Sequence, residues 1–455
     1  MRRVLIFAGL ALCLLSAFAP VSSAKTKKAE KFGFLPSATA EQNTAALQKC
    51  VDGGGVITVS TPGSYKLCGT ILLDSNTEIR FGKGVVIERA RSSKGVSANH
   101  VFLNRGALDR TWNENITLRG LRLKVNGIDG GKDIPGIVGL RGHLAFFYIR
   151  NLLLEDIEIP DLEKSRYGIH ICTFENAVVS KVRIEGRKDG VHFGTGKGFV
   201  VRDGIFKTYD DPIALNAHDY PTSNPELGWI EDGLIENCYD LDDPERGTVG
   251  YFARFLGGAW KDWTEGMTIQ LNGDAVVSEG RIYRSIYHPV SDSTRVSTCR
   301  PVHKSGTVTY PDGLTWVMAQ DKNICYNCGV RNVVFRNIHL QKKRRQALSI
   351  HFDKSKFSRS YYPYAESPVM DNIVFDKVSV EADIPVLVMS RAPINSFSIQ
   401  NSSIGSSKIQ LVDIETPGIV YDTTHILLKN TTCDDPSKLV MPTSRPFSLE
   451  NEAKK

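Results

Sequence analysis

A short phrase that recurs about every two dozen residues constrains the fold of this chain more than any other feature of its sequence. Each copy combines an Asn or similar polar residue, an alternating run of β-branched residues, a polar pair and a second alternating run. Copies read ENITLRGLRLKV from 114, RNLLLEDIEI from 150, ENAVVSKVRIEG from 175, KGFVVRDGIFKT from 197, RNVVFRNIHLQ from 331 and DNIVFDKVSVEA from 371. Alternation with a period of two predicts strands, and the polar pairs predict the corners between them.

The spacing of the closest copies, about 22 to 25 residues, fits one coil of a solenoid with three short strands and three turns. One coil cannot bury its own inward side chains, so stacked coils must form the core, with neighbouring strands about 4.8 Å apart. We therefore predict an all-β fold, a single-stranded right-handed parallel β-helix. The segment AEQNTAALQKCVDGGGVITVS from 40 predicts a short helix that caps the open N-terminal end, where exposed strand edges could otherwise pair with other chains.

The two ends of the chain do not follow the repeat. Residues 1–24 carry two arginines, an apolar stretch and small residues before Lys25, which predicts a secretory signal peptide cleaved near Ala24. We expect residues 25–433 to form the β-helix catalytic domain and residues 434–455 to form a polar C-terminal tail. The expected location is secreted or periplasmic, without membrane insertion, because no later segment approaches 18 uncharged apolar residues.

Two stretches inside the chain also interrupt the rhythm, residues 217–229 and about 240–325. Long excursions from a rigid scaffold are where binding walls are usually built. Cys325 and Cys328 form a lone CxxC, which favours a local disulfide or buried thiols over a zinc site that would need a second pair. The basic run at 342–345 lies between two predicted strands, and we expect it to be a solvated turn.

Three aspartates in the stretch GRKDGVHFGTGKGFVVRDGIFKTYDDPIALNAHD, residues 186–219, carry the prediction of chemistry. Asp189 precedes Asp210 by 21 residues, one coil length, and Asp211 follows. Residues one coil apart stack on adjacent strands, so the three carboxylates should gather on one wall. The alternative is that Asp189 caps a turn and that Asp210 and Asp211 are solvated corner residues.

Clustered carboxylates suit the hydrolysis of a glycosidic bond. One carboxylic acid must protonate the leaving oxygen and a carboxylate must activate water, with a separation of about 6.5 to 9.5 Å in inverting enzymes. Crowding raises the pKa of at least one carboxyl group, which keeps an acid protonated near neutral pH.

The chain resembles the polygalacturonase-like family 28 glycoside hydrolases of the pectate-lyase-like β-helix superfamily in its QNTAALQKCVDGGGVITVS opening, its solenoid phrases and its DG then DD pattern. The resemblance implies that Asp189 and Asp211 activate water and that Asp210 is the acid. The family's GHG and RIK motifs are missing, since the coil where GHG belongs reads GTVGYFARFLGG. Those motifs grip galacturonate, so the substrate does not follow from the resemblance.

Further candidates for substrate binding lie near the aspartates in sequence or in the excursions: His192, Asn216, His218, Arg254, Trp229 and Trp260. The planar fork of Arg254 suits a carboxylate or sulfate, and tryptophan faces suit sugar rings. A solvated loop histidine, a surface ion pair and loop packing are the structural alternatives for these residue types.

We therefore predict an inverting glycoside hydrolase that acts on an acidic plant or algal polysaccharide. It should need no metal or organic cofactor, bind no nucleic acid and be a monomer. One alternative is a lyase with a Lys or Arg base and calcium on the aspartates. Against it, Lys188 should point away from Asp189 if both lie in one strand. A non-catalytic glycan-binding β-helix is the other alternative.

Overall fold

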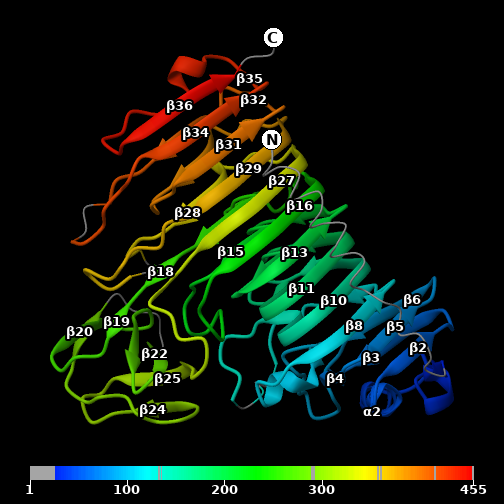
Figure 1. Cartoon of the computed structure of the whole chain (residues 1–455). Helices are drawn as coiled ribbons and strands as arrows, with labels where there is room; N and C mark the ends of the chain where they lie inside the picture. The colour runs from blue at the N-terminus through cyan, green and yellow to red at the C-terminus, as the bar shows by residue number, and fades with distance from the viewer. Residues whose placement is uncertain are drawn as a thin grey trace.

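The computed structural model describes residues 26–131, 134, 136–287, 293–355, 358, 361–414 and 417–452, and they form a right-handed parallel β-helix (Figure 1). This confirms the predicted fold class. The expected signal peptide lies outside the described residues. Within them, no helix has the length and apolar character needed to cross a membrane.

Three parallel walls enclose the core. The first wall contains β4 (Ile71–Leu73), β7 (Phe102–Asn104), β12 (Val191–Phe193), β15 (Ile213–Asn216), β17 (Ala253–Leu256), β28 (Gln346–His351), β30 (Val386–Ser390) and β33 (Lys408–Leu411). The second contains β1 (Lys27–Lys28), β2 (Gly55–Val59), β5 (Thr77–Phe81), β8 (Asn113–Arg119), β13 (Gly196–Arg202), β31 (Ser396–Gln400), β34 (Thr424–Lys429) and β36 (Phe447–Glu452). The third contains β3 (Gly63–Leu67), β6 (Val85–Arg89), β9 (Leu123–Lys124), β14 (Ile205–Thr208), β32 (Ser403–Gly405) and β35 (Thr432–Cys433).

Longer strands bend from one wall into the next. β10 (Gly142–Leu162) and β11 (Tyr167–Gly186) run through all three walls. The strands that join the second and third walls are β16 (Ile230–Asp240), β27 (Val330–Leu340) and β29 (Asp371–Val380).

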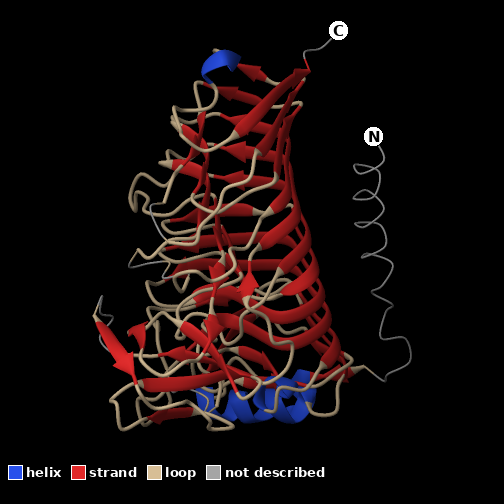
Figure 2. Cartoon of the chain, turned by 60° about the vertical axis from the view of Figure 1, so that its left-hand side comes forward, coloured by secondary structure: helices blue, strands red, loops and turns tan. Residues whose placement is uncertain are grey.

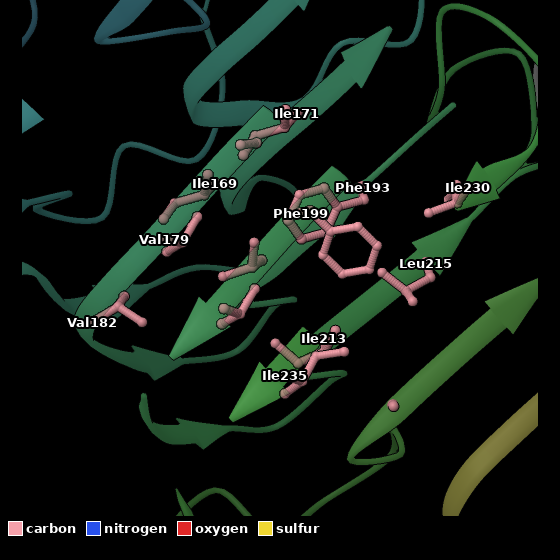
Figure 3. Packing of buried hydrophobic residues seen from close by; sticks show 14 of the residues in the cluster. Ile169, Ile171, Val179, Val182, Phe193, Phe199, Ile213, Leu215, Ile230 and Ile235 are labelled. Carbon is pink, nitrogen blue, oxygen red and sulfur yellow. The ribbon is translucent and has the colours of Figure 1, made fainter. Parts of the chain in front are cut away.

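Alternate residues of each strand point into the core. Ile171, Phe193 and Leu215 stack on successive strands of the first wall and are fully buried (Figure 3). Phe199 and Ile235 approach from the second wall. Each coil therefore buries its apolar residues only against its neighbours, as the repeat predicts.

The predicted cap is present as α2 (Ala40–Val51), which lies at one end of the stacked strands (Figure 2). Thr39 and Gln42 form a capping box, and Leu47, Cys50 and Val51 are buried against the first coils. Three 3-10 turns complete the helical elements among the described residues: η1 (Ala29–Phe32), η2 (Arg105–Leu108) and η3 (Pro436–Lys438).

The second excursion folds into a side unit with a hydrophobic cluster of its own around Trp316 and Tyr283. Its five-stranded sheet contains β19 (Lys261–Asp262), β21 (Ala275–Ser278), β22 (Arg281–Ser285), β24 (Thr307–Thr309) and β25 (Thr315–Gln320). Two small antiparallel pairs join it: β18 (Gly258–Ala259) with β26 (Asn327–Cys328), and β20 (Met267–Gln270) with β23 (Thr294–Ser297).

The structure bears on three further expectations. Residues after 433 do not simply trail along the rod, because β36 pairs in parallel with β34 and extends the solenoid. Of the two alternatives for the CxxC pair, the structure has free thiols, with Cys328 buried and Cys325 half-buried. The basic run at 342–345 is not a solvated turn, because Lys342 and Arg344 are buried while their neighbours Lys343 and Arg345 are exposed.

Candidate active site

The three aspartates lie at the corner through which the chain enters the first wall. Val191 of β12 pairs with Ile213 of β15, so one coil is 22 residues long here. The predicted alignment of Asp189 with Asp210 is therefore wrong by one residue, and Asp189 stacks on Asp211. The backbone supports this register, since Gly190 N–H donates to the carbonyl of Asp211 at 2.9 Å.

The carboxylates nevertheless converge as expected. One oxygen of each of Asp189, Asp210 and Asp211 lies within 4.8 Å of the other two. Asp189 and Asp211 are buried, whereas 22% of the Asp210 side chain is exposed. This spacing between nearest oxygens is shorter than the separation of about 6.5 to 9.5 Å that is usual for inverting hydrolases.

Lys188 is a member of the site that the sequence reasoning missed. The residue lies in a bend rather than in a strand, so the expected alternation does not apply. Its ammonium group donates to Asp189 Oδ1 at 3.0 Å and also contacts Asp210 Oδ2. The argument that Lys188 points away is therefore wrong.

The surroundings shift the pKa values of the three carboxyl groups in opposite directions. Burial favours the neutral form of Asp189, but the Lys188 charge and the His192 hydrogen bond outweigh it and hold the pKa of Asp189 below its usual value. Burial and the Asp189 charge raise the pKa of Asp210. Burial and the charges of Asp210 and Asp189 raise the pKa of Asp211 further, against the opposing charge of Arg254.

Two of the candidate binding residues join this cluster. His192 is fully buried, its Nδ1 lies 3.0 Å from Asp189 Oδ2, and its ring stacks on Tyr167 at 4.1 Å. Arg254 occupies the same register position as His192 two strands further along, with Ala214 between them. Burial alone would lower the pKa of Arg254, but the charges of Asp211 and Asp219 raise it.

Asn216 is the last residue of β15, and His218 lies at the start of the first excursion. The side-chain amide of Asn216 donates to Asp219 Oδ2 at 2.8 Å, and the main-chain carbonyl of Asn216 accepts from Asn224 Nδ2 at 2.6 Å. His218 is buried 6.3 Å from the Trp260 ring, and burial lowers its pKa well below the usual value. In this structure both side chains hold the excursion against the first wall.

The two candidate tryptophans do not lie at the carboxylates. Trp260 is 1% exposed and donates through Nε1 to the carbonyl of Cys325 at 2.7 Å, which is packing of the side unit. Trp229 lines a cavity of about 390 Å³ beyond the far end of the first wall, with Arg331 stacked on its ring at 4.8 Å. Thr195 of that cavity is six residues from Asp189, about 20 Å of extended chain.

Tyrosines flank the stacked aspartates and were also missed. The 22-residue register that places Asp189 on Asp211 places Tyr167 directly before Asp189, a spacing visible in the sequence. Tyr251 follows Asp211 after a 40-residue coil, and its N–H donates to Asp211 Oδ1 at 2.8 Å. No sequence period could have found that second neighbour.

A divalent cation would find its oxygen ligands in the same three aspartates. The Lys188 ammonium already contacts two of them, so an ion bound to all three would have to displace or share with that charge.

Comparisons with known proteins show the fold. No protein-family model matches the sequence, and no curated protein matches it. The crystal structure of a hyperthermoactive exopolygalacturonase from Thermotoga maritima is similar over 98% of this chain and 95% of its own, with a TM-score of 0.51 and 13% identity. A family 28 exopolygalacturonase from Yersinia enterocolitica is similar over 95% of this chain and 78% of its own, with a TM-score of 0.47 and 11% identity.

A surface adhesin is also among the similar solved structures. PfbA, a surface adhesin of Streptococcus pneumoniae, is similar over 94% of this chain and 90% of its own, with a TM-score of 0.45 and 11% identity. Likeness at these identities concerns the fold and not the chemistry. The chain has the right-handed parallel β-helix fold that the Thermotoga exopolygalacturonase also has.

Proposed function

We propose that this protein hydrolyses glycosidic bonds in a polysaccharide. The observation that carries the proposal is the corner where three carboxyl groups meet, one with a lowered pKa and two with raised pKa values. Neighbouring titratable groups whose environments separate their pKa values are the usual mark of an acid and base pair.

The exposed fractions of the three side chains support the following roles in this proposal. Asp210 is the most exposed of the three, so it can reach the glycosidic oxygen and donate its proton as the C–O bond breaks. Asp189, held ionised, takes a proton from the water whose oxygen attacks the anomeric carbon. Asp211 lies beside Asp189 and shares the positioning of that water. Because the carboxylates lie closer together than is usual for inverting enzymes, the stereochemical outcome needs a test of its own. NMR of the product anomer formed first measures it directly.

Lys188 favours hydrolysis over elimination. A lyase needs a neutral base to remove the proton next to a uronate carboxyl group. Burial would lower the pKa of Lys188, but the charges of Asp189 and Asp210 raise it well above the usual value, so the side chain stays an ammonium ion. Its role in the proposal is to keep Asp189 ionised.

The charge around the corner favours an acidic glycan. Lys188 and Arg254 lie among the aspartates, and the Arg141 guanidinium lies 5.3 Å from the Tyr167 ring. Guanidinium groups bind carboxylates and sulfates through paired hydrogen bonds. Polygalacturonan is the first substrate to test, because fold neighbours include exopolygalacturonases.

We also propose that the protein is exported and acts as a monomer without a cofactor. Support for export comes from the signal-like residues 1–24. Fractionation should recover the protein outside the cytoplasm with an N-terminus near Lys25. Protein found only in the cytoplasm would contradict export, and a retained Met1 would contradict cleavage near Ala24.

The test of the function is release of reducing ends from pectic, rhamnogalacturonan and sulfated algal polymers by the wild type and by Asp210→Asn, with absorbance at 235 nm recorded together. Reducing ends without absorbance, lost in the variant, are expected. Rising absorbance would show a lyase instead. Binding without cleavage of any polymer would show a glycan-binding protein.

A further inference from the structure

The corner that carries Asp210 and Asp211 departs from the geometry of a strand. In an extended strand consecutive side chains point to opposite faces, yet both carboxylates here reach Asp189. The corner spans the gap between β14, which ends at Thr208, and β15, which begins at Ile213. Something must hold this backbone in its bent form.

Hydrogen bonds from neighbouring coils and from within the corner hold its carbonyl groups. The carbonyl of Tyr209 accepts from the N–H groups of Val249 at 2.9 Å and Gly250 at 3.2 Å, and that of Asp211 accepts from Gly190 on the preceding coil. The carbonyl of Asp210 accepts from Thr208 Oγ1 at 2.9 Å. A further donor to Asp210 and the side-chain donor to Thr208 come from one buried side chain.

That side chain is Arg344, from the basic run that the sequence assigned to a solvated turn. Its Nη2 donates to the carbonyl of Thr208 at 3.3 Å, and its Nη1 lies 3.4 Å from the carbonyl of Asp210. Nη1 also donates to Thr248 Oγ1 at 3.1 Å. Asp240 fixes the guanidinium through Nε at 2.6 Å and Nη2 at 2.9 Å.

These contacts use every N–H of the guanidinium, which has five. Arg344 and Asp240 are both fully buried at the side chain. A pair of this kind has one geometry, because the planar fork meets the carboxylate through two parallel bonds. The catalytic corner, Asp240 and Arg344 belong to three successive coils, since β14 pairs with β16 and β16 with β27.

We propose that Arg344, held by Asp240, is a positioning residue that keeps Asp210 and Asp211 turned toward Asp189. The proposal rests on the proposed function, for which it supplies the geometry of the acid. Without the guanidinium, the carbonyl of Thr208 loses its side-chain donor and that of Asp210 keeps only Thr208 Oγ1. The corner then relaxes toward an extended strand, which separates the two carboxylates.

A lysine cannot replace this arginine, because a point charge cannot make the paired bonds to Asp240 and also reach two carbonyl groups. Arg344→Lys is therefore the informative variant, since it keeps the charge. Arg345→Lys is its matched control, because Arg345 is the next residue and is exposed.

The test compares kcat, KM and the pH profile of both variants with the wild type on a polysaccharide that the wild type cleaves. Arg344→Lys should lower kcat about 100-fold while KM changes less than about threefold, because a displacement of about 1 Å in an acid costs rate rather than binding. Arg345→Lys should match the wild type. An Arg344→Lys enzyme with wild-type kcat and only a lower melting temperature would overturn the proposal.

The pH profile separates positioning from mere stability. The groups that face Asp210 are Lys188, Asp189, Asp211 and Arg254. If the corner opens, Asp210 becomes less buried and moves away from both Asp189 and Lys188, so its raised pKa returns toward the usual value and the alkaline limb of the rate should move to lower pH in Arg344→Lys. A purely structural role would leave that limb in place.

A carbon NMR titration of the aspartate carboxyl groups makes the test independent of catalysis. The titration of Asp210 should shift to lower pH in Arg344→Lys and stay unchanged in Arg345→Lys, even if no polymer is cleaved. An unchanged titration of Asp210 in Arg344→Lys would contradict the positioning role. If the wild type cleaves no polymer, only the proposed function is contradicted. If Arg344→Lys does not fold, Thr248→Val, which removes one contact of Nη1, should show the same shift at smaller size.

Discussion

Near the start of the second wall, Asn76, Asn115, Asn151 and Asn176 stack one above another, each with a positive φ between 52° and 60°. The last three amides each donate to the asparagine on the preceding coil, at 2.8, 3.0 and 3.2 Å along the stack. At the corner before the first wall, the same stacking places Asp189 on Asp211.

The asparagine stack and the aspartate corner differ in whether a side chain can hydrogen-bond to the same residue type on the next coil. An amide has both a donor and an acceptor, so stacked asparagines satisfy one another. An ionised carboxylate only accepts, so stacked aspartates repel and depend on Lys188 and Arg254 for compensation. In this solenoid, stacked asparagines therefore stabilise neighbouring coils, whereas stacked aspartates have shifted pKa values.

The largest effect should come from Asp189→Asn, which makes the aspartate corner resemble the asparagine stack. The amide cannot take a proton from water, so hydrolysis should fall about 10²- to 10⁴-fold. Reducing-sugar assays at saturating substrate measure the loss, and the melting temperature should show that the variant is folded. Retention of more than a tenth of the activity would rule out Asp189 as the base.

Lys188→Met should show how much the folded state depends on a positive charge beside the aspartates. Removing one partner of a largely buried pair should cost about 3 kcal/mol of unfolding free energy at pH 7, because Asp189 and Asp210 then lose their ammonium contact. Urea denaturation measures it, with Lys181→Met as the control, since Lys181 pairs with Glu155 at the surface and should cost less than about 1 kcal/mol.

The cost of Lys188→Met should also depend on pH. The lowered pKa of Asp189 gives stability that is present above its unfolded value of about 4 and is lost as the pH falls through the folded value. The difference between wild type and variant should therefore shrink as the pH is lowered below 4. A difference that is constant with pH would mean that Lys188 acts by packing alone.

Asn151→Ala tests the contribution of the asparagine stack to stability. It removes an amide with partners on both neighbouring coils and puts alanine, which tolerates the left-handed region less well than asparagine, at a φ of 52°; together these changes should cost about 2 kcal/mol. Asn151→Gly relieves the backbone part and should cost about 1 kcal/mol. Equal losses for the two variants in urea denaturation would show that the backbone conformation contributes nothing.

Asp211→Asn should have the smallest effect on stability, and the effect should be stabilising. The pKa of Asp211 is raised by burial and by the charges of Asp210 and Asp189, so its stability contribution is complete below about pH 4 and lost as the pH rises through the folded value. The amide removes that loss, so the variant should be more stable than the wild type at pH 7 and equally stable near pH 3. Melting curves at both pH values decide it, and destabilisation at pH 7 would show that the Tyr251 hydrogen bond needs the charge.

The sequence alone determined the coils of the solenoid, because each coil forms from a short-range pattern of residues. Alternating residues set the inward faces, polar pairs set the corners, and Thr39 with Gln42 marks the start of the capping helix. The approach of Asp189 to the Asp210–Asp211 pair follows from a coil length of about two dozen residues, and His192 lies three residues after Asp189 in the sequence.

Tertiary structure decided everything that depends on how coils of unequal length meet. The exact partner of Asp189 depends on a register of 22 rather than 21 residues, and a shift of one residue exchanges the faces of a strand. Arg254 arrives after a 40-residue coil, so no period predicts it. Lys188 turns inward and Arg344 is buried because corner backbones do not alternate and because buried carboxylates and carbonyl groups draw these charges in.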